Sequence, residues 1–175
     1  MILPAHLLIA ALLVLGVQGN AAAAHGVPGM ERLDGVAPAF VLETDSPAPL
    51  SLETLRGRAV LLHFFATWCL PCRDELPKLA GLEARLPADR IAVIAIAIDE
   101  DAGAIAAFAA QYGRGLPVHV ARAGEVPPAY WTWGVPVTYL LDAAGRFVAR
   151  ALGPRDWSGV TTDMLIEAAA ASGAR

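Results

Sequence analysis

The fold is decided by residues 59–77, which read AVLLHFFATWCLPCRDELP. The first part, residues 59–66, is a nearly unbroken apolar run that is rich in branched and aromatic side chains. Because the run does not alternate with polar residues, it predicts a strand that is covered on both faces of its sheet. Cys69 and Cys72 follow almost directly. The stretch therefore predicts a strand that leads into a helix, with two cysteines where the helix begins.

A second apolar run, residues 91–98, predicts another strand of the same kind. Leucines recur at helical spacing between the two runs, at positions 76, 79, 82 and 86. A strand, a helix and a strand in this order form a βαβ unit, whose two strands are parallel. The first half of the domain is therefore expected to be of the α/β class.

The remaining segments extend this unit into one α/β domain. Apolar side chains at helical spacing over residues 105–112 predict a second amphipathic helix. Two apolar runs, 137–141 and 147–152, flank the turn sequence DAAG and predict a β-hairpin. Shorter elements are expected as strands at 40–42, 50–52 and 117–120 and as a closing helix at 158–171. Together these elements predict a central mixed β-sheet flanked by helices.

The composition fits a single domain with a sizeable core. The chain has 175 residues, of which 56% are hydrophobic and 17% are charged. Its 13 basic residues are scattered and are outnumbered by 17 acidic ones, so there is no electrostatic reason to expect a nucleic-acid partner. Two cysteines are too few for a disulfide-rich scaffold.

The amino-terminal residues, 1–24, have the layout of a secretory signal peptide. An apolar run at 7–15 is followed by small residues, and the alanines at 22–24 fit a cleavage site before His25. This segment contains no Lys or Arg, so an uncleaved membrane anchor is the alternative, although a bilayer span takes roughly 20 apolar residues. Either reading predicts an exported, periplasmic protein whose cysteines lie outside the reducing cytosol.

The chain after the signal peptide is expected to divide into a linker and a domain. Residues 25–36 contain three glycines and a proline and show no apolar period, which is typical of a linker. The α/β domain is then expected to cover residues 37–175.

The spacing of the two cysteines predicts thiol-disulfide exchange. A thiol at a helix amino terminus faces unpaired backbone N–H groups and the positive end of the helix dipole, which both favour the thiolate of Cys69. Cys72 lies one helical turn further on and can close a disulfide with Cys69. Cys69 can therefore attack a disulfide of another protein, and Cys72 can resolve the mixed disulfide.

Two other roles for a CxxC pair have less support in the sequence. Tetrahedral zinc needs four ligands, and no second CxxC or nearby His pair supplies the missing two. A purely structural disulfide across two intervening residues would constrain the unfolded chain only weakly. We therefore expect no resident metal and no cofactor.

The residues around the pair resemble the thioredoxin superfamily and, within it, the exported TlpA/ResA-like thiol-disulfide oxidoreductases. The resemblance covers residues 37–171 and rests on FFATWCLPCRDELP at 64–77 and GVPVTYLLD at 134–142. It implies a thioredoxin-like fold and disulfide exchange at the cysteine pair.

The resemblance also implies a substrate-binding wall beside the cysteines. In that family the proline that matches Pro136 is cis and faces the pair, so Val135 and Pro136 are expected to contact an extended substrate segment. Trp68 precedes Cys69 and is expected either to shield the nucleophile or to pack as an ordinary apolar residue.

Two ionisable residues lie near the pair in sequence, and each has two possible roles, one functional and one structural. Glu75 is three residues after Cys72, and the resemblance implies a carboxyl that assists proton movement there; the alternative is a solvated carboxylate near the helix start. His63 is six residues before Cys69, where the family has an acid or an amide. It is expected either to accept a proton from Cys72 or to be a neutral core histidine.

The expected function is that of an exported disulfide reductase. Its expected substrates are protein disulfides, such as those of apocytochrome c or of copper-site assembly proteins, and a membrane thiol carrier would supply the electrons. Three alternatives stay open: a net thiol oxidant, a copper carrier that uses both cysteines as soft ligands, and a thiol peroxidase on the same fold.

Overall fold

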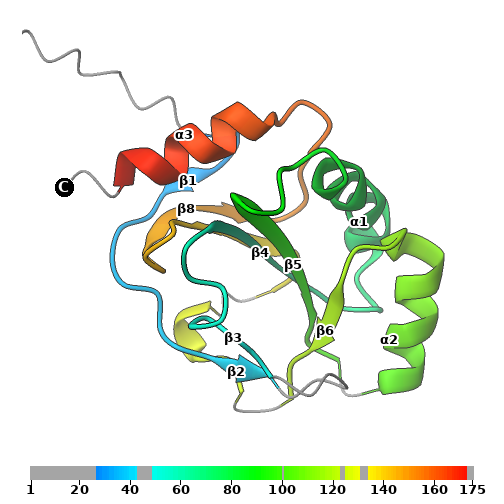
Figure 1. Ribbon diagram of the computed structural model, residues 1–175. Helices are drawn as coiled ribbons and strands as arrows, with labels where there is room; N and C mark the ends of the chain where they lie inside the picture. Colours follow the sequence, from blue (N-terminus) through cyan, green and yellow to red (C-terminus); the bar gives the residue numbers. More distant parts are fainter. Residues whose placement is uncertain (1–26, 43–48, 100, 123–124, 131–133, 173–175) are drawn as a thin grey trace, which may run out of the picture.

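The computed structural model describes residues 27–42, 49–99, 101–122, 125–130 and 134–172 (Figure 1). Six strands form the main sheet in the order β1-β8-β7-β4-β5-β6. The strands of this sheet are β1 (Glu31–Arg32), β4 (Ala59–Phe65), β5 (Ile91–Ala97), β6 (Val118–Val120), β7 (Val137–Leu141) and β8 (Phe147–Leu152). A separate pair consists of β2 (Val41–Leu42) and β3 (Leu50–Ser51).

The sheet is mixed, as the sequence predicts. Strand β4 runs parallel to β5, and β5 runs parallel to β6. On its other side β4 is antiparallel to β7, which forms the expected hairpin with β8. All seven residues of β4 are buried. Leu61 and Phe65 pack in the core on one face of the sheet, and Leu62 and Phe64 pack in the core on the other.

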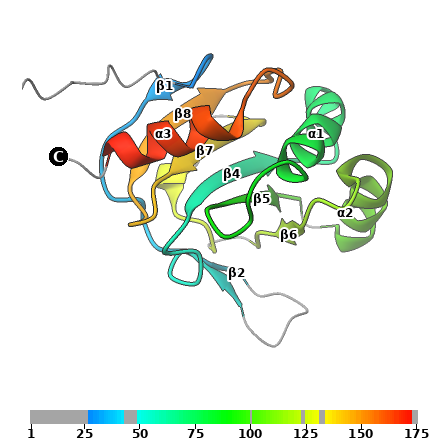
Figure 2. The same ribbon diagram turned by 45° about the horizontal axis from the view of Figure 1, so that its top comes forward.

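The helices of the described residues are α1 (Leu70–Glu83), α2 (Ala102–Phe108), the π-helical turn η1 (Ala109–Gly113), the 3₁₀ turn η2 (Pro128–Tyr130) and α3 (Thr162–Ser172). Helices α1, α2 and α3 pack in the core that contains Leu61 and Phe65 (Figure 2). The β2–β3 pair and η2 cover the opposite core. The predicted helix at 105–112 is thus split into α2 and a π-helical turn, and the closing helix begins four residues later than expected.

Part of the expected linker belongs to the domain. Strand β1 pairs with β8 in antiparallel register, and Val27 is buried in the core. Val36 makes a further bridge to Arg146. The linker assignment of 25–36 is therefore wrong for residues 27–36, because this segment covers the backbone edge that β8 would otherwise expose.

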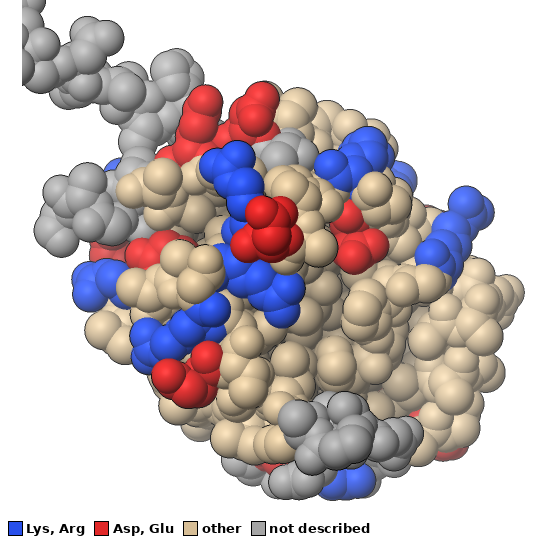
Figure 3. Space-filling view, in the orientation of Figure 1, with Lys and Arg blue, Asp and Glu red and all other residues tan. Residues whose placement is uncertain are grey.

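The expected signal peptide or anchor at 1–24 lies outside the described residues. Within the described segments, no helix is both long and apolar enough to cross a membrane. Acidic and basic side chains are interspersed over the face seen in Figure 3.

The two faces of β4 predict a contrast in stability between two leucines. Leu62→Ala is expected to lower the free energy of unfolding by about 2–5 kcal/mol, because Leu62 is fully buried and its removal leaves a cavity. Leu152→Ala is the matched control, since Leu152 is 55% exposed, and it should cost less than about 0.5 kcal/mol. Urea denaturation measures both, and equal losses would contradict the packing described here.

Candidate active site

The two cysteines lie where β4 ends and α1 begins. Cys69 caps the amino terminus of α1, and Cys72 lies in its first turn. Their sulfur atoms are joined in a disulfide. The backbone N–H of Cys72 is directed at Sγ of Cys69, at 3.3 Å. Cys72 is completely buried, whereas Cys69 is 4% exposed, so Cys69 is the one that solvent or a substrate can reach.

The loop before Cys69 is fixed by the neighbouring parallel strand. The backbone N–H of Thr67 donates to the carboxylate of Asp99, at 2.7 Å, just after β5. The N–H of Ile98 donates to the carbonyl of Phe65, the last residue of β4. Because both bonds join the carboxyl ends of β4 and β5, the pairing of these strands also sets the position of the cysteine loop.

The segment at 135–136 lies beside Cys69, as the resemblance implies. The Val135–Pro136 peptide bond is cis. The carbonyl oxygen of Val135 lies 3.7 Å from Sγ of Cys69. Pro136 itself is buried, and its carbonyl accepts a hydrogen bond from the N–H of Gly153. The cysteine loop and the segment before β7 therefore meet at Cys69, and the residue after β8 supports that segment.

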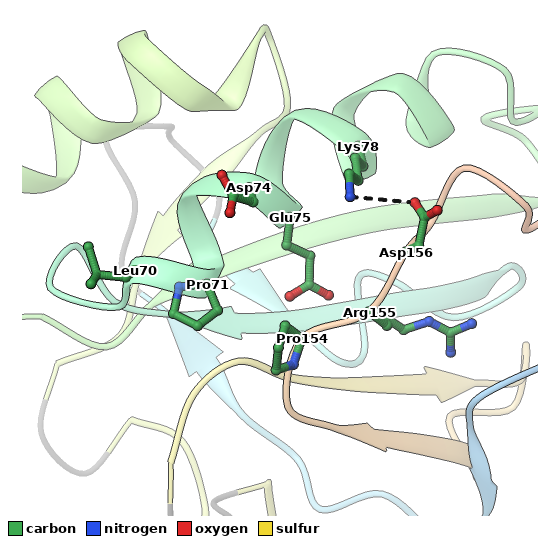
Figure 4. Close-up of a pocket in the computed structure, with 8 residues that line it drawn as sticks. All are labelled: Leu70, Pro71, Asp74, Glu75, Lys78, Pro154, Arg155 and Asp156. Carbon is green, nitrogen blue, oxygen red and sulfur yellow. Dashed lines mark ion pairs between the residues drawn. The ribbon is translucent and has the colours of Figure 1, made fainter.

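Glu75 is buried on α1 rather than solvated. Its side chain points toward the segment that carries Pro154 and Arg155 (Figure 4). Oε1 accepts a hydrogen bond from the indole N–H of Trp157, at 2.5 Å. Burial raises the pKa of Glu75 to about 7, against the opposing effects of Trp157, of the Arg155 backbone and charge, and of Lys78. The alternative of a solvated helix-start carboxylate is therefore wrong.

An open cavity of about 510 Å³ lies between α1 and the segment that follows β8. Leu70 and Pro71, the two residues between the cysteines, line one side of it. Glu75 also lines the cavity, and an ion pair between Lys78 and Asp156, at 3.6 Å, crosses its rim (Figure 4). The cavity therefore lies beside both the buried carboxyl of Glu75 and the two residues that separate the cysteines.

His63 lies on the cysteine side of the sheet. Strand side chains alternate, so His63 shares the face of Leu61 and Phe65, which pack in the same core as both cysteines. Its Nδ1 is 2.9 Å from the hydroxyl of Thr138 on β7, and its Nε2 has no hydrogen-bond partner among the described residues. Burial lowers the pKa of His63 to about 3, so the imidazole is neutral at pH 7.

Two large apolar side chains are exposed beside the pair. Trp68 is 67% exposed and Leu70 is 66% exposed. An ordinary packing role for Trp68 is therefore wrong.

Among the described residues, no group of three or more His, Cys, Asp or Glu side chains converges as a metal site requires.

Trp157 and Arg155 carry no functional signal in the sequence. Both lie in an irregular segment between β8 and α3. Trp157 is fully buried, and the guanidinium of Arg155 lies 4.2 Å from the centre of its ring. A tryptophan in an irregular segment has no local pattern that would connect it to a carboxyl 82 positions earlier.

Comparison with known proteins identifies the chain at the level of the family. Residues 34–168 match the AhpC/TSA family. The chain belongs to the AhpC/TSA family. This member is 31% identical to thiol-disulfide oxidoreductase ResA of Bacillus anthracis over 117 residues, which are 67% of this chain and 68% of that protein. It is 32% identical to ResA of Bacillus subtilis over 117 residues, 67% of this chain and 65% of that protein.

Solved structures of similar proteins agree with the assignment of this chain to the family. A thioredoxin-family thiol:disulfide interchange protein from Chlorobium tepidum is 27% identical, with a TM-score of 0.65 over 79% of this chain and 98% of that chain. StoA from Bacillus subtilis, at 23% identity and a TM-score of 0.60 over 76% of this chain and 97% of that chain, shows the same fold. The protein is therefore a thiol-disulfide oxidoreductase with a thioredoxin-like fold.

The buried, neutral His63 predicts a specific dependence of stability on pH. Below the usual histidine pKa of about 6.5 the unfolded chain binds a proton that the folded protein does not bind until about pH 3. This difference makes the folded state less stable as the pH falls through that window, by roughly 1.4 kcal/mol per pH unit. In His63→Asn this contribution to the loss should disappear, and urea denaturation from pH 7 to pH 4 measures the change in slope.

His119→Asn is the matched control for this experiment. His119 on β6 is half-buried, and burial lowers its pKa as well, so the variant should flatten the slope less than His63→Asn does. If His63→Asn and the unmodified protein lose stability in parallel, the neutral state of His63 is contradicted.

Proposed function

We propose that this protein is an exported disulfide reductase that acts on other proteins. In its dithiol form the Cys69 thiolate attacks one sulfur of a substrate disulfide, which releases one substrate thiol and leaves a mixed disulfide. The Cys72 thiolate then attacks the sulfur of Cys69. This step closes the Cys69–Cys72 disulfide and releases the second substrate thiol. Two electrons pass to the substrate in each cycle.

The observation that carries this direction is that, in the described part of the chain, no Lys or Arg side chain is buried beside the pair. A strongly oxidising pair is one whose reduced form is stabilised, which a neighbouring Lys, Arg or protonated His can do. Apart from the cysteines, the buried ionisable side chains of β4 and α1 are the neutral His63 and the carboxyl of Glu75. The residues between the cysteines, Leu70 and Pro71, are uncharged. Among the buried features of the described residues, the helix amino terminus is therefore the one that favours the Cys69 thiolate.

Glu75 is proposed to handle the proton of Cys72 during resolution. Residues three apart on a helix lie on the same side, and both Glu75 and Cys72 are buried on α1. With a pKa of about 7, Glu75 is present in both its protonated and its ionised form near neutral pH. His63 is proposed to assist as a neutral acceptor in the tautomer whose Nδ1–H donates to Thr138, because this tautomer leaves the unpartnered Nε2 able to receive a hydrogen bond.

Protein substrates fit the surface beside Cys69. The exposed side chains of Trp68 and Leu70 and the backbone of Val135 offer an apolar area and a carbonyl to an extended segment. The proposed substrates are disulfides of apocytochrome c or of metal-site assembly proteins. A membrane thiol carrier is the proposed electron donor, and the amino-terminal 24 residues are proposed to direct export or to anchor the protein.

The reduction potential of the Cys69–Cys72 pair tests the proposed direction. Equilibration of the domain with defined thiol buffers should give a value near or below roughly −220 mV, because a weakly stabilised thiolate makes the dithiol a good reductant. A value near about −120 mV would make the protein an oxidant and overturn the proposal. If the pair exchanges with no disulfide, a copper carrier becomes the better account, and copper titration of the reduced protein tests it.

A further inference from the structure

Trp157 joins the segment after β8 to the carboxyl on α1. The indole is fully buried in the core that also contains Cys69 and Cys72. Its N–H donates to Oε1 of Glu75 at 2.5 Å, and both partners are buried. An indole N–H can only donate, so this contact orients the carboxyl oxygen that receives it.

The hydrogen bond acts on a carboxyl whose charge is finely balanced. Burial disfavours the carboxylate, whereas the Trp157 donor favours it. Four charged side chains face the same cavity: Asp74 and Lys78 from α1, and Arg155 and Asp156 from the segment after β8. Lys78 is paired with Asp156, so part of its charge is neutralised there.

Arg155 holds the indole from the outside. Its guanidinium lies over the Trp157 ring, at 4.2 Å from the ring centre, and donates to the carbonyl of Pro28. The guanidinium also lies close to Gly29, where an added Cβ would be 3.7 Å from it. The indole is thus packed between the core and an arginine that the amino-terminal segment keeps in place.

We propose that Trp157 is a positioning residue of this oxidoreductase, which holds the Glu75 carboxyl in the orientation that serves Cys72, and that Arg155 clamps the indole. The inference rests on the proposed proton transfer by Glu75. It extends the site to two residues that are distant in sequence from the cysteines. It also makes the folded segment at 27–30 part of the support of the site.

The test compares Trp157→Phe with the unmodified protein. Phenylalanine keeps an aromatic ring in the core but removes the N–H donor. The titration of Glu75, followed by the ¹³C resonance of its carboxyl, should shift upward by roughly one pH unit, because a donor to the charged form is lost. Tyr130→Phe is the matched control: it removes a buried donor, to the carbonyl of Pro38, on the opposite face of the sheet. It should leave the Glu75 titration unchanged.

Two further measurements separate this inference from the proposed function. The pH dependence of disulfide exchange should move upward in Trp157→Phe but should not respond to the same change made in a Glu75→Gln background. If Glu75 titrates at the same pH with and without the Trp157 donor, the positioning role is overturned. If the titration shifts but Glu75→Gln exchanges like the unmodified protein, the positioning role stands and the proposed proton transfer fails.

A measurement on the unmodified protein covers the case in which Trp157→Phe does not fold. The ¹⁵N–¹H resonance of the Trp157 indole should change with pH and show the same midpoint as the Glu75 carboxyl, since the two groups share a hydrogen bond. An indole resonance that does not follow the Glu75 titration would overturn the inference.

Discussion

The burial of β4 on both faces is the constraint on which the site depends. Its seven residues pack into one core or the other, which fixes the strand between β5 and β7. At the carboxyl end of β4, hydrogen bonds to Asp99 and Ile98 hold the loop that leads to the cysteines. Helix α1 then begins with Cys69 at its amino terminus. The same pairing with β7 brings Val135 beside the sulfur of Cys69.

Exclusion of water determines the electrostatics below the cysteines. Burial lowers the pKa of His63 and raises the pKa of Glu75, so it disfavours the charged form of each group. The imidazole of His63 therefore carries no positive charge near the pair at pH 7. The pKa of the Glu75 carboxyl is raised to about 7. The amino terminus of α1 is left as the main feature that favours the Cys69 thiolate.

Local patterns in the sequence were sufficient for the central fold and for the cysteine pair. The apolar run of β4, the leucines of α1 and the turn of the β7–β8 hairpin each lie within one short stretch, so periodicity alone predicts them. The edge strand β1 has two residues and no apolar pattern, because pairing with β8 rather than burial holds it. Its glycine-rich surroundings therefore suggested a linker.

The supporting contacts of the site could not be predicted in this way. The Glu75–Trp157 bond spans 82 positions, and the contact between His63 and Thr138 spans 75. In both pairs, the residue type of one member does not indicate the other. The packing of α1 and β7 around β4 brings the members of each pair together. The choice between a solvated and a buried Glu75, which the sequence left open, depends on this packing.

The most direct test of the central claim is to compare the reactivity of the two thiols in the fully reduced protein. Limiting iodoacetamide at pH 7, followed by mass spectrometry, measures which cysteine is alkylated first. Cys69 is expected to react at least about tenfold faster, because it is partly accessible, at 4% exposed, and caps the helix amino terminus, whereas Cys72 is completely buried. Faster modification of Cys72, or equal rates at both positions, would contradict the assignment of Cys69 as the attacking thiolate.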